Sequence, residues 1–83
     1  MKILGAATAL STTTTKFDTA TAVWVFNTDT SAAVVTLRNA ADDADLGSIY
    51  VGAGAGMAIH LSLGDGLRGA TTIYGTKIAS SGV

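Results

Sequence analysis

His60, Ser62 and Asp65 are the residues whose types and spacing come nearest to a hydrolytic site. A histidine can act as general base for a serine hydroxyl while a carboxylate orients the imidazole. His60 and Ser62 would share one face of a strand, because strand side chains alternate with period two. A triad also needs a cleft to position it, and an 83-residue chain has little material for one. We therefore expect no enzyme and no catalytic residue, and we interpret His60 as a surface or interface histidine.

Two other segments have the composition of a ligand site without its spacing. Asp42, Asp43 and Asp45 cluster, but an EF-hand calcium loop needs alternating ligands and a closing glutamate, and the chain has no glutamate. The glycine-rich run at 52–56 lacks the Lys-Ser/Thr pair and the following helix of a phosphate-binding loop. The absence of cysteine and the single histidine exclude thiolate and histidine-rich metal sites within one chain. We predict no cofactor and no metal, and interpret both segments as turns.

The aromatic residues could form a base-stacking platform for single-stranded nucleic acid. Such a platform is accompanied by a basic groove, but the five basic residues of this chain are scattered along it. We therefore predict no nucleic-acid partner. Core packing or a subunit contact is the interpretation we prefer, since tryptophan and tyrosine are frequent in protein interfaces. The residues concerned are Trp24, Phe26, Tyr50 and Tyr74.

The size and charge of the chain favour association with other chains. A domain of this length buries only about 60% of the surface of its unfolded chain, and small domains often gain stability from disulfides, metals or oligomerisation. Only oligomerisation remains here, and the formal charge of −1 suits a protein packed against neighbours. No segment reaches the roughly 18 apolar residues of a membrane span. The apolar run near the start is too short for a signal peptide, so we expect no membrane partner and synthesis in a cytoplasm.

The elements that would position these residues read as β-strands. Threonine, valine, isoleucine and alanine dominate, proline is absent, and no window shows a helical stripe. We predict a single all-β domain over residues 1–83, a small antiparallel β-sandwich or barrel of six to eight short strands. Segments 21–27 and 33–39 are expected to form a hairpin, 64–69 to form a turn, and Gly75 to mark a bulge or a close backbone approach. The expected strands are 2–10, 21–27, 33–39, 46–51, 57–63 and 71–79, with 11–16 an edge strand or a loop.

The segment 21–27 is apolar on both of its faces. Val23 and Val25 point one way, whereas Ala22, Trp24 and Phe26 point the other way. A small antiparallel domain normally buries one face of a strand and exposes the other to water. The sequence does not decide which face belongs to the core, but it predicts that another chain covers the second face.

Three stretches carry a resemblance to a known family: MKILGAATALSTTTT, VWVFNTDTSAAVVTL and GSIYVGAGAGMAIHL. With its V-x-V-x-N strand at Val23, Val25 and Asn27, the chain resembles short virion structural proteins of tailed phages that infect marine cyanobacteria. The resemblance implies a non-enzymatic virion component. The leading expectation is a capsid decoration (cement) protein that binds the outer shell as an oligomer and stabilises it.

The resemblance also implies partners and a location. We expect a homo-oligomer, with a trimer favoured, bound to the major capsid protein on the capsid surface of the virion, with residues 1–5 and 80–83 as extended arms. The alternatives are a phage tail or baseplate component, or a host-surface or carbohydrate-binding β-module. The expected interface residues are Ile3, Leu4, Trp24, Phe26, Tyr50, His60 and Tyr74.

Overall fold

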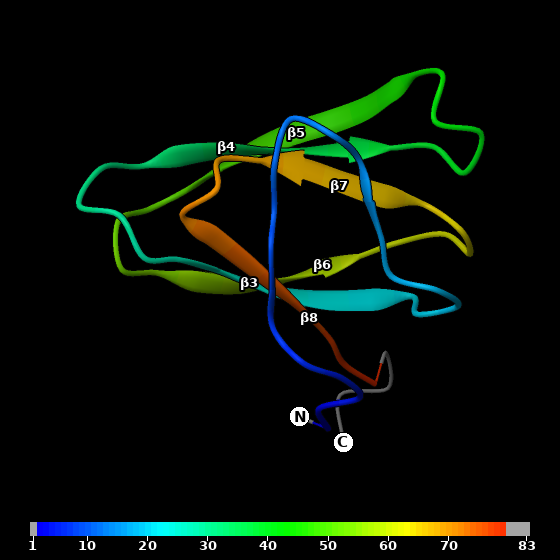
Figure 1. The fold of residues 1–83 in the computed structure, drawn as a ribbon, viewed down its shortest axis with the longest axis horizontal. Coiled ribbons are helices and arrows are strands. Elements are labelled where there is room, and N and C mark those ends of the chain that lie inside the picture. Colours follow the sequence, from blue (N-terminus) through cyan, green and yellow to red (C-terminus); the bar gives the residue numbers. More distant parts are fainter. Residues whose placement is uncertain (1, 80–83) are drawn as a thin grey trace.

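The computed structural model describes residues 2–79, which fold into two four-stranded antiparallel sheets packed face to face (Figure 1). The first sheet has the order β1-β8-β3-β6 and the second the order β2-β7-β4-β5. Residues 2–79 contain no helix, so the predicted all-β class is confirmed, with eight strands. The strands are β1 Thr8–Ala9, β2 Thr15–Lys16, β3 Ala22–Asn27, β4 Ala33–Arg38, β5 Asp45–Val51, β6 Gly56–His60, β7 Gly66–Gly69 and β8 Ile73–Lys77.

The chain crosses between the sheets at nearly every connection, and within residues 2–79 only β4 and β5 form a hairpin in one sheet. The predicted hairpin of 21–27 with 33–39 is therefore wrong, because β3 pairs with β6 and β8 while β4 pairs with β5 and β7. The Asn27 side chain gives the physical reason. It is fully buried, and its Nδ2 donates to Ser31 O at 2.9 Å and to Val51 O at 3.0 Å. These bonds direct the chain after β3 toward the opposite sheet.

The core lies between the sheets and resolves which face of β3 is internal. Val23 and Val25 are fully buried, whereas Trp24 is half-buried and Phe26 is 40% exposed on the solvent side of the sheet. The valine face is the core because it meets the inward face of the second sheet, where Val35 and Leu67 lie. The buried apolar cluster consists of Leu10, Phe17, Val23, Val25, Val35, Val51, Leu61, Leu67 and Ile73.

Three predicted boundaries are wrong. Segment 2–10 contains only the two-residue β1 and an isolated bridge between Ile3 and Ile78. Segment 64–69, expected to be a turn, contains strand β7, because its Leu67 is fully buried and pairs with Leu37 of β4. Strand β6 ends at His60, so Leu63 is 65% exposed instead of sharing a buried face.

The two lateral sides of the sandwich differ. One side has β1 and β2 as its edge strands, and the segment joining them crosses from one sheet to the other (blue in Figure 1). Leu10 and Phe17, which flank this segment, are 0% and 5% exposed and close the core. Gly75 makes the predicted close approach, since a Cβ there would lie 2.8 Å from the Phe17 ring. The other side has β5 and β6 as its edges.

The start of the described chain lies against its end. Leu4 N donates to Lys77 O at 2.8 Å, and Ala79 N donates to Lys2 O at 2.9 Å. Segment 2–4 is therefore hydrogen bonded to the continuation of β8. Met1 and residues 80–83 lie outside the described residues, and the predicted role of both ends as arms stays a prediction.

Candidate interaction surfaces

Three aromatic residues gather on the outer surface of the first sheet, and we call Trp24, Phe26 and Tyr74 the aromatic face. Trp24 and Phe26 follow each other on the outward side of β3, and Phe26 pairs directly with Tyr74 of β8. Phe26 and Tyr74 are 40% and 42% exposed. Strands β3 and β6 contain no Lys, Arg, Asp or Glu, and the outward neighbours of the aromatic residues include Thr76 of β8, opposite Trp24. A partner docking here would therefore meet aromatic side chains with few polar groups beside them.

Trp24 lies against the backbone of β6 at Gly56. A Cβ placed on Gly56 would lie 2.7 Å from Cζ2 of the indole and 2.9 Å from its Nε1. Glycine is therefore required at this position for the ring to lie close to the sheet. The contact fixes the orientation of Trp24 and leaves the ring half-buried before any partner binds.

The outer surface of the second sheet carries a charged network beside the exposed Val34–Tyr50 pair. Arg38 donates from Nε to Asp42 Oδ1 at 3.0 Å and from Nη1 to Asp45 Oδ1 at 2.7 Å. Arg68 Nε donates to Thr14 Oγ1 at 2.8 Å, and the Thr14 hydroxyl donates in turn to Asp42. The Thr14 hydrogen bond, followed by that from Arg38, lowers the pKa of Asp42. These contacts join the β4–β5 hairpin to the crossing segment.

The three carboxylates of the aspartate cluster each accept a side-chain hydrogen bond. The Asp42 and Asp45 carboxylates accept from Arg38, and the Asp43 carboxylate accepts from Asn39 Nδ2 at 2.7 Å. Within residues 2–79, no group of three or more His, Cys, Asp or Glu is arranged to hold a metal ion.

The glycine-rich segment 52–55 is the connection from β5 to β6, and Gly54 adopts a positive φ of 64° there.

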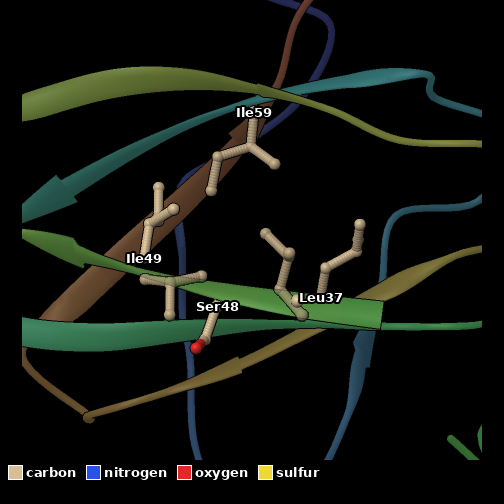
Figure 2. Close-up of a pocket in the computed structure, with 7 residues that line it drawn as sticks. Leu37, Ser48, Ile49 and Ile59 are labelled. Atoms are coloured by element: carbon tan, nitrogen blue, oxygen red, sulfur yellow. The ribbon is translucent and has the colours of Figure 1, made fainter. Parts of the chain in front are cut away.

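An apolar groove of about 250 Å³ opens between the two sheets on the β5–β6 side. Figure 2 shows Ile59 pointing from β6 toward Ile49 of β5 and Leu37 of β4 across the gap between the sheets. These side chains lie on the inward faces of their strands, yet Ile49 is 41% exposed. Met57, on the inward side of β6, is 38% exposed. The core is therefore open to solvent on this side.

The structure brings together part of the predicted interface set. Trp24, Phe26 and Tyr74 form the aromatic face, and His60 lies exposed on the same side of that sheet, opposite Ala22. Tyr50 lies on the second sheet and is 75% exposed. The remaining two, Ile3 and Leu4, lie beside the end of β8 with exposures of 66% and 48%.

The groove was not predicted as a site. Alternation along 46–51 and 57–63 gives which side chains share a face of each strand, but not that the sandwich stays open beside them. That information depends on which strands lie at the sheet edges, which sequence alternation does not give.

The residues of the possible triad do not assemble. Asp65 is 5% exposed, and its Oδ2 accepts from the Ser62 backbone N–H at 3.0 Å. Among residues 2–79, no hydrogen bond joins His60 to Ser62 or Asp65. The structure uses Asp65 to hold the turn between β6 and β7.

Within the described part of the chain, no helix has the length and apolar character needed to cross a membrane. Comparisons of the chain with protein-family models, with curated proteins and with solved structures find no match.

Proposed function

We propose that this protein is a non-enzymatic structural component of a tailed-phage particle, and that it decorates the capsid by binding the major capsid protein. The observation that carries the proposal is the aromatic face, since Trp24, Phe26 and Tyr74 lie together on a sheet surface whose β3 and β6 strands present no charge there. Tryptophan and tyrosine are enriched among the residues that carry most of the binding energy of protein interfaces. The family resemblance supplies the kind of particle.

The fold supports a decorating role by its rigidity. The aromatic residues lie on β3 and β8, both of which are hydrogen bonded on each side by neighbouring strands. Trp24 is further fixed by its contact with Gly56. A preformed surface loses little conformational entropy on binding, which favours stable attachment to a repeating lattice.

Co-sedimentation with purified particle parts tests the proposal. The protein is mixed with purified heads, and separately with purified tails, of the phage that encodes it, and bound protein is quantified over a concentration series. We expect binding to heads that saturates and raises the temperature at which the heads release their DNA. Binding to tails alone would contradict capsid decoration and support a tail or baseplate role. Binding to neither would overturn the proposal.

Two variants of the aromatic face locate the contact. Phe26→Ser and Tyr74→Ser change exposed side chains, so the fold should persist, and each is expected to weaken head binding at least tenfold. Leu63→Ser is the matched control, because Leu63 is an exposed apolar residue in the β6–β7 connection. Equal binding by all three variants would exclude the aromatic face as the contact.

A carbohydrate-binding module is the second candidate, because half-exposed aromatic rings on an open sheet can stack against sugars. Trp24 is the sole tryptophan of the chain, so its fluorescence reports on this face alone. A saturable change of this fluorescence with host cell-surface polysaccharide, abolished in Tyr74→Ser, would favour this candidate over capsid decoration. An unchanged spectrum would exclude it.

A further inference from the structure

The open side of the sandwich presents two unpaired strand edges together with an uncovered part of the core. β5 is the outermost strand of one sheet and β6 of the other, and each pairs with a neighbour on one side only. Six of the seven residues of β5 are exposed. The groove lined by Leu37, Ile49 and Ile59 lies between the two edges (Figure 2).

These edges lack the features that normally prevent strand pairing. Natural edge strands are very short, or carry charged residues, proline or bulges. Residues 46–51 of β5 and all of β6 contain no charged residue and no proline. The charge and the bulge of β5 are confined to its start, where Asp45 pairs with Arg38 and the register shifts between Leu37 and Arg38. The opposite edges do carry these protections, since β1 and β2 have two residues each and β2 includes Lys16.

We propose that the open side is a self-association surface, where a second copy of this chain pairs β5 with β5 and β6 with β6 about a two-fold axis. The geometry selects a second copy as the occupant. A single added strand would satisfy one edge and leave the other unpaired. A partner must offer one free edge in each of two layers at the spacing of this sandwich, and the chain itself offers that arrangement.

The side chains agree with this symmetry. With the axis at Ser48, antiparallel pairing places Ile49 opposite Gly47 of the second copy and Tyr50 opposite Leu46. Residues that are opposite each other in an antiparallel pair share a face, and Ile49 and Gly47 both point inward. A Cβ on Gly47 would meet no atom within 4 Å, so there is space beside it for the isoleucine of the partner. The same chemistry occurs on both copies, as an isologous interface requires.

The apolar surface available is consistent with a stable dimer. Leu46, Ile49, Tyr50 and Met57 are four of the ten exposed large hydrophobic residues in the described chain, and all belong to β5 or β6. A standard interface buries about 800 Å² per partner, roughly a fifth of the 4460 Å² surface of this molecule. Pairing would add backbone hydrogen bonds on two strands and would continue both sheets into eight-stranded sheets.

Light scattering and an engineered crosslink test the proposal on purified protein without any capsid. We expect a mass of twice 8.3 kDa at micromolar concentration. The chain has no cysteine, so Ser48→Cys introduces a single thiol at the expected axis. Opposed Cα atoms in antiparallel strands lie about 4.5–5.5 Å apart, within disulfide range. Mild oxidation should therefore crosslink Ser48→Cys at least tenfold faster than Thr12→Cys, a control on the opposite side.

Charge substitutions at the two edges complete the test. Ile49→Lys and Met57→Lys each place a charge beside the groove, and both are expected to give monomers of 8.3 kDa with unchanged circular dichroism. Tyr74→Ser, on the aromatic face, should leave the dimer intact. A monomer of the native chain at high concentration, a trimer, or equal crosslinking of the two cysteine variants would overturn the inference. None of these results depends on head binding, so failure of the proposed function would be seen separately.

Discussion

The two lateral sides of the sandwich differ in how they cover the core between the sheets. On the β1–β2 side, Leu10 of the crossing segment and Phe17, which follows β2, fill the gap between the sheets, and both are buried. On the β5–β6 side, the 52–55 connection crosses between the sheets with all of its residues exposed, and Ile49 and Met57 remain 41% and 38% exposed. A chain of this size closes one side of its core from within. A further chain would therefore cover more exposed core surface on the β5–β6 side than on the β1–β2 side.

The largest expected loss of stability comes from removing a buried side chain on the β1–β2 side, which we call the closed side. Leu10→Ala removes a fully buried side chain and should lower the free energy of unfolding by about 2–5 kcal/mol. Ile49→Ala, on the open side, should cost less than about 1 kcal/mol in the monomer, because much of the side chain is already in water. Urea unfolding at low protein concentration measures both. Equal losses of unfolding free energy in the two variants would show that the two sides are packed alike.

Sequence patterns predicted the strand content better than the arrangement of the strands. Alternation within 21–27 correctly separated the two faces of β3, because alternation is a local property. The hairpin of 21–27 with 33–39 was wrong because the polar residues between them suit either a tight turn or an arch between sheets. The choice depends on Asn27 reaching Val51 O, a contact 24 residues away.

One prediction made from a glycine position is confirmed and another is wrong, because the role of a glycine also depends on contacts that are distant in the sequence. At Gly75 a close approach was predicted and is confirmed by Phe17. At 64–69 the glycines suggested a turn, but Gly66 lies in β7, where a Cβ would be 2.8 Å from Thr15 O. A glycine that bends the chain and a glycine that admits a neighbour look the same in one sequence. Residue type alone suggested the aromatic residues as interface candidates, but it did not show that the β3–β8 register brings Phe26 and Tyr74 together while Tyr50 lies on the other sheet.

Two glycine-to-alanine substitutions, one on each side, test how tightly the two sides are packed. Gly75→Ala adds a methyl group 2.8 Å from the Phe17 ring and should destabilise the protein by about 1–3 kcal/mol, because the closed side is already filled. Gly47→Ala meets nothing within 4 Å and should be neutral or stabilise by up to about 1 kcal/mol, because alanine has less freedom in the unfolded chain. Thermal melts distinguish the two, and a destabilised Gly47→Ala monomer would contradict the open geometry.

Removing the hydrogen bonds of the Lys16 side chain is expected to cost less stability. Lys16 Nζ donates to Ala40 O at 2.7 Å and to Gly64 O at 2.9 Å, which connects β2 to two turns. Lys16→Met keeps the length of the side chain and removes these bonds. We expect a loss of about 1 kcal/mol, since both acceptors can bind water instead. Lys2→Met is the control, and an equal change in melting temperature for both variants would show that Lys16 contributes nothing specific.

The smallest expected effect is a dependence of the stability of the closed side on pH. The Thr14 hydroxyl, followed by Arg38, lowers the pKa of Asp42 below its ordinary 3.8. A carboxylate whose pKa is lowered by folding contributes stability above the pKa that it has in the unfolded chain, and this contribution is lost as pH falls through the folded value. The native protein should therefore lose melting temperature below about pH 3.8 more steeply than Asp42→Asn, whose amide does not titrate. Because Thr14 belongs to the crossing segment, the protection of amides 10–16 against hydrogen exchange, corrected for the intrinsic rate at each pH, should fall over the same pH range while the protection of β5 stays unchanged. Parallel pH profiles for the native protein and Asp42→Asn would show that the carboxylate does not anchor the crossing segment.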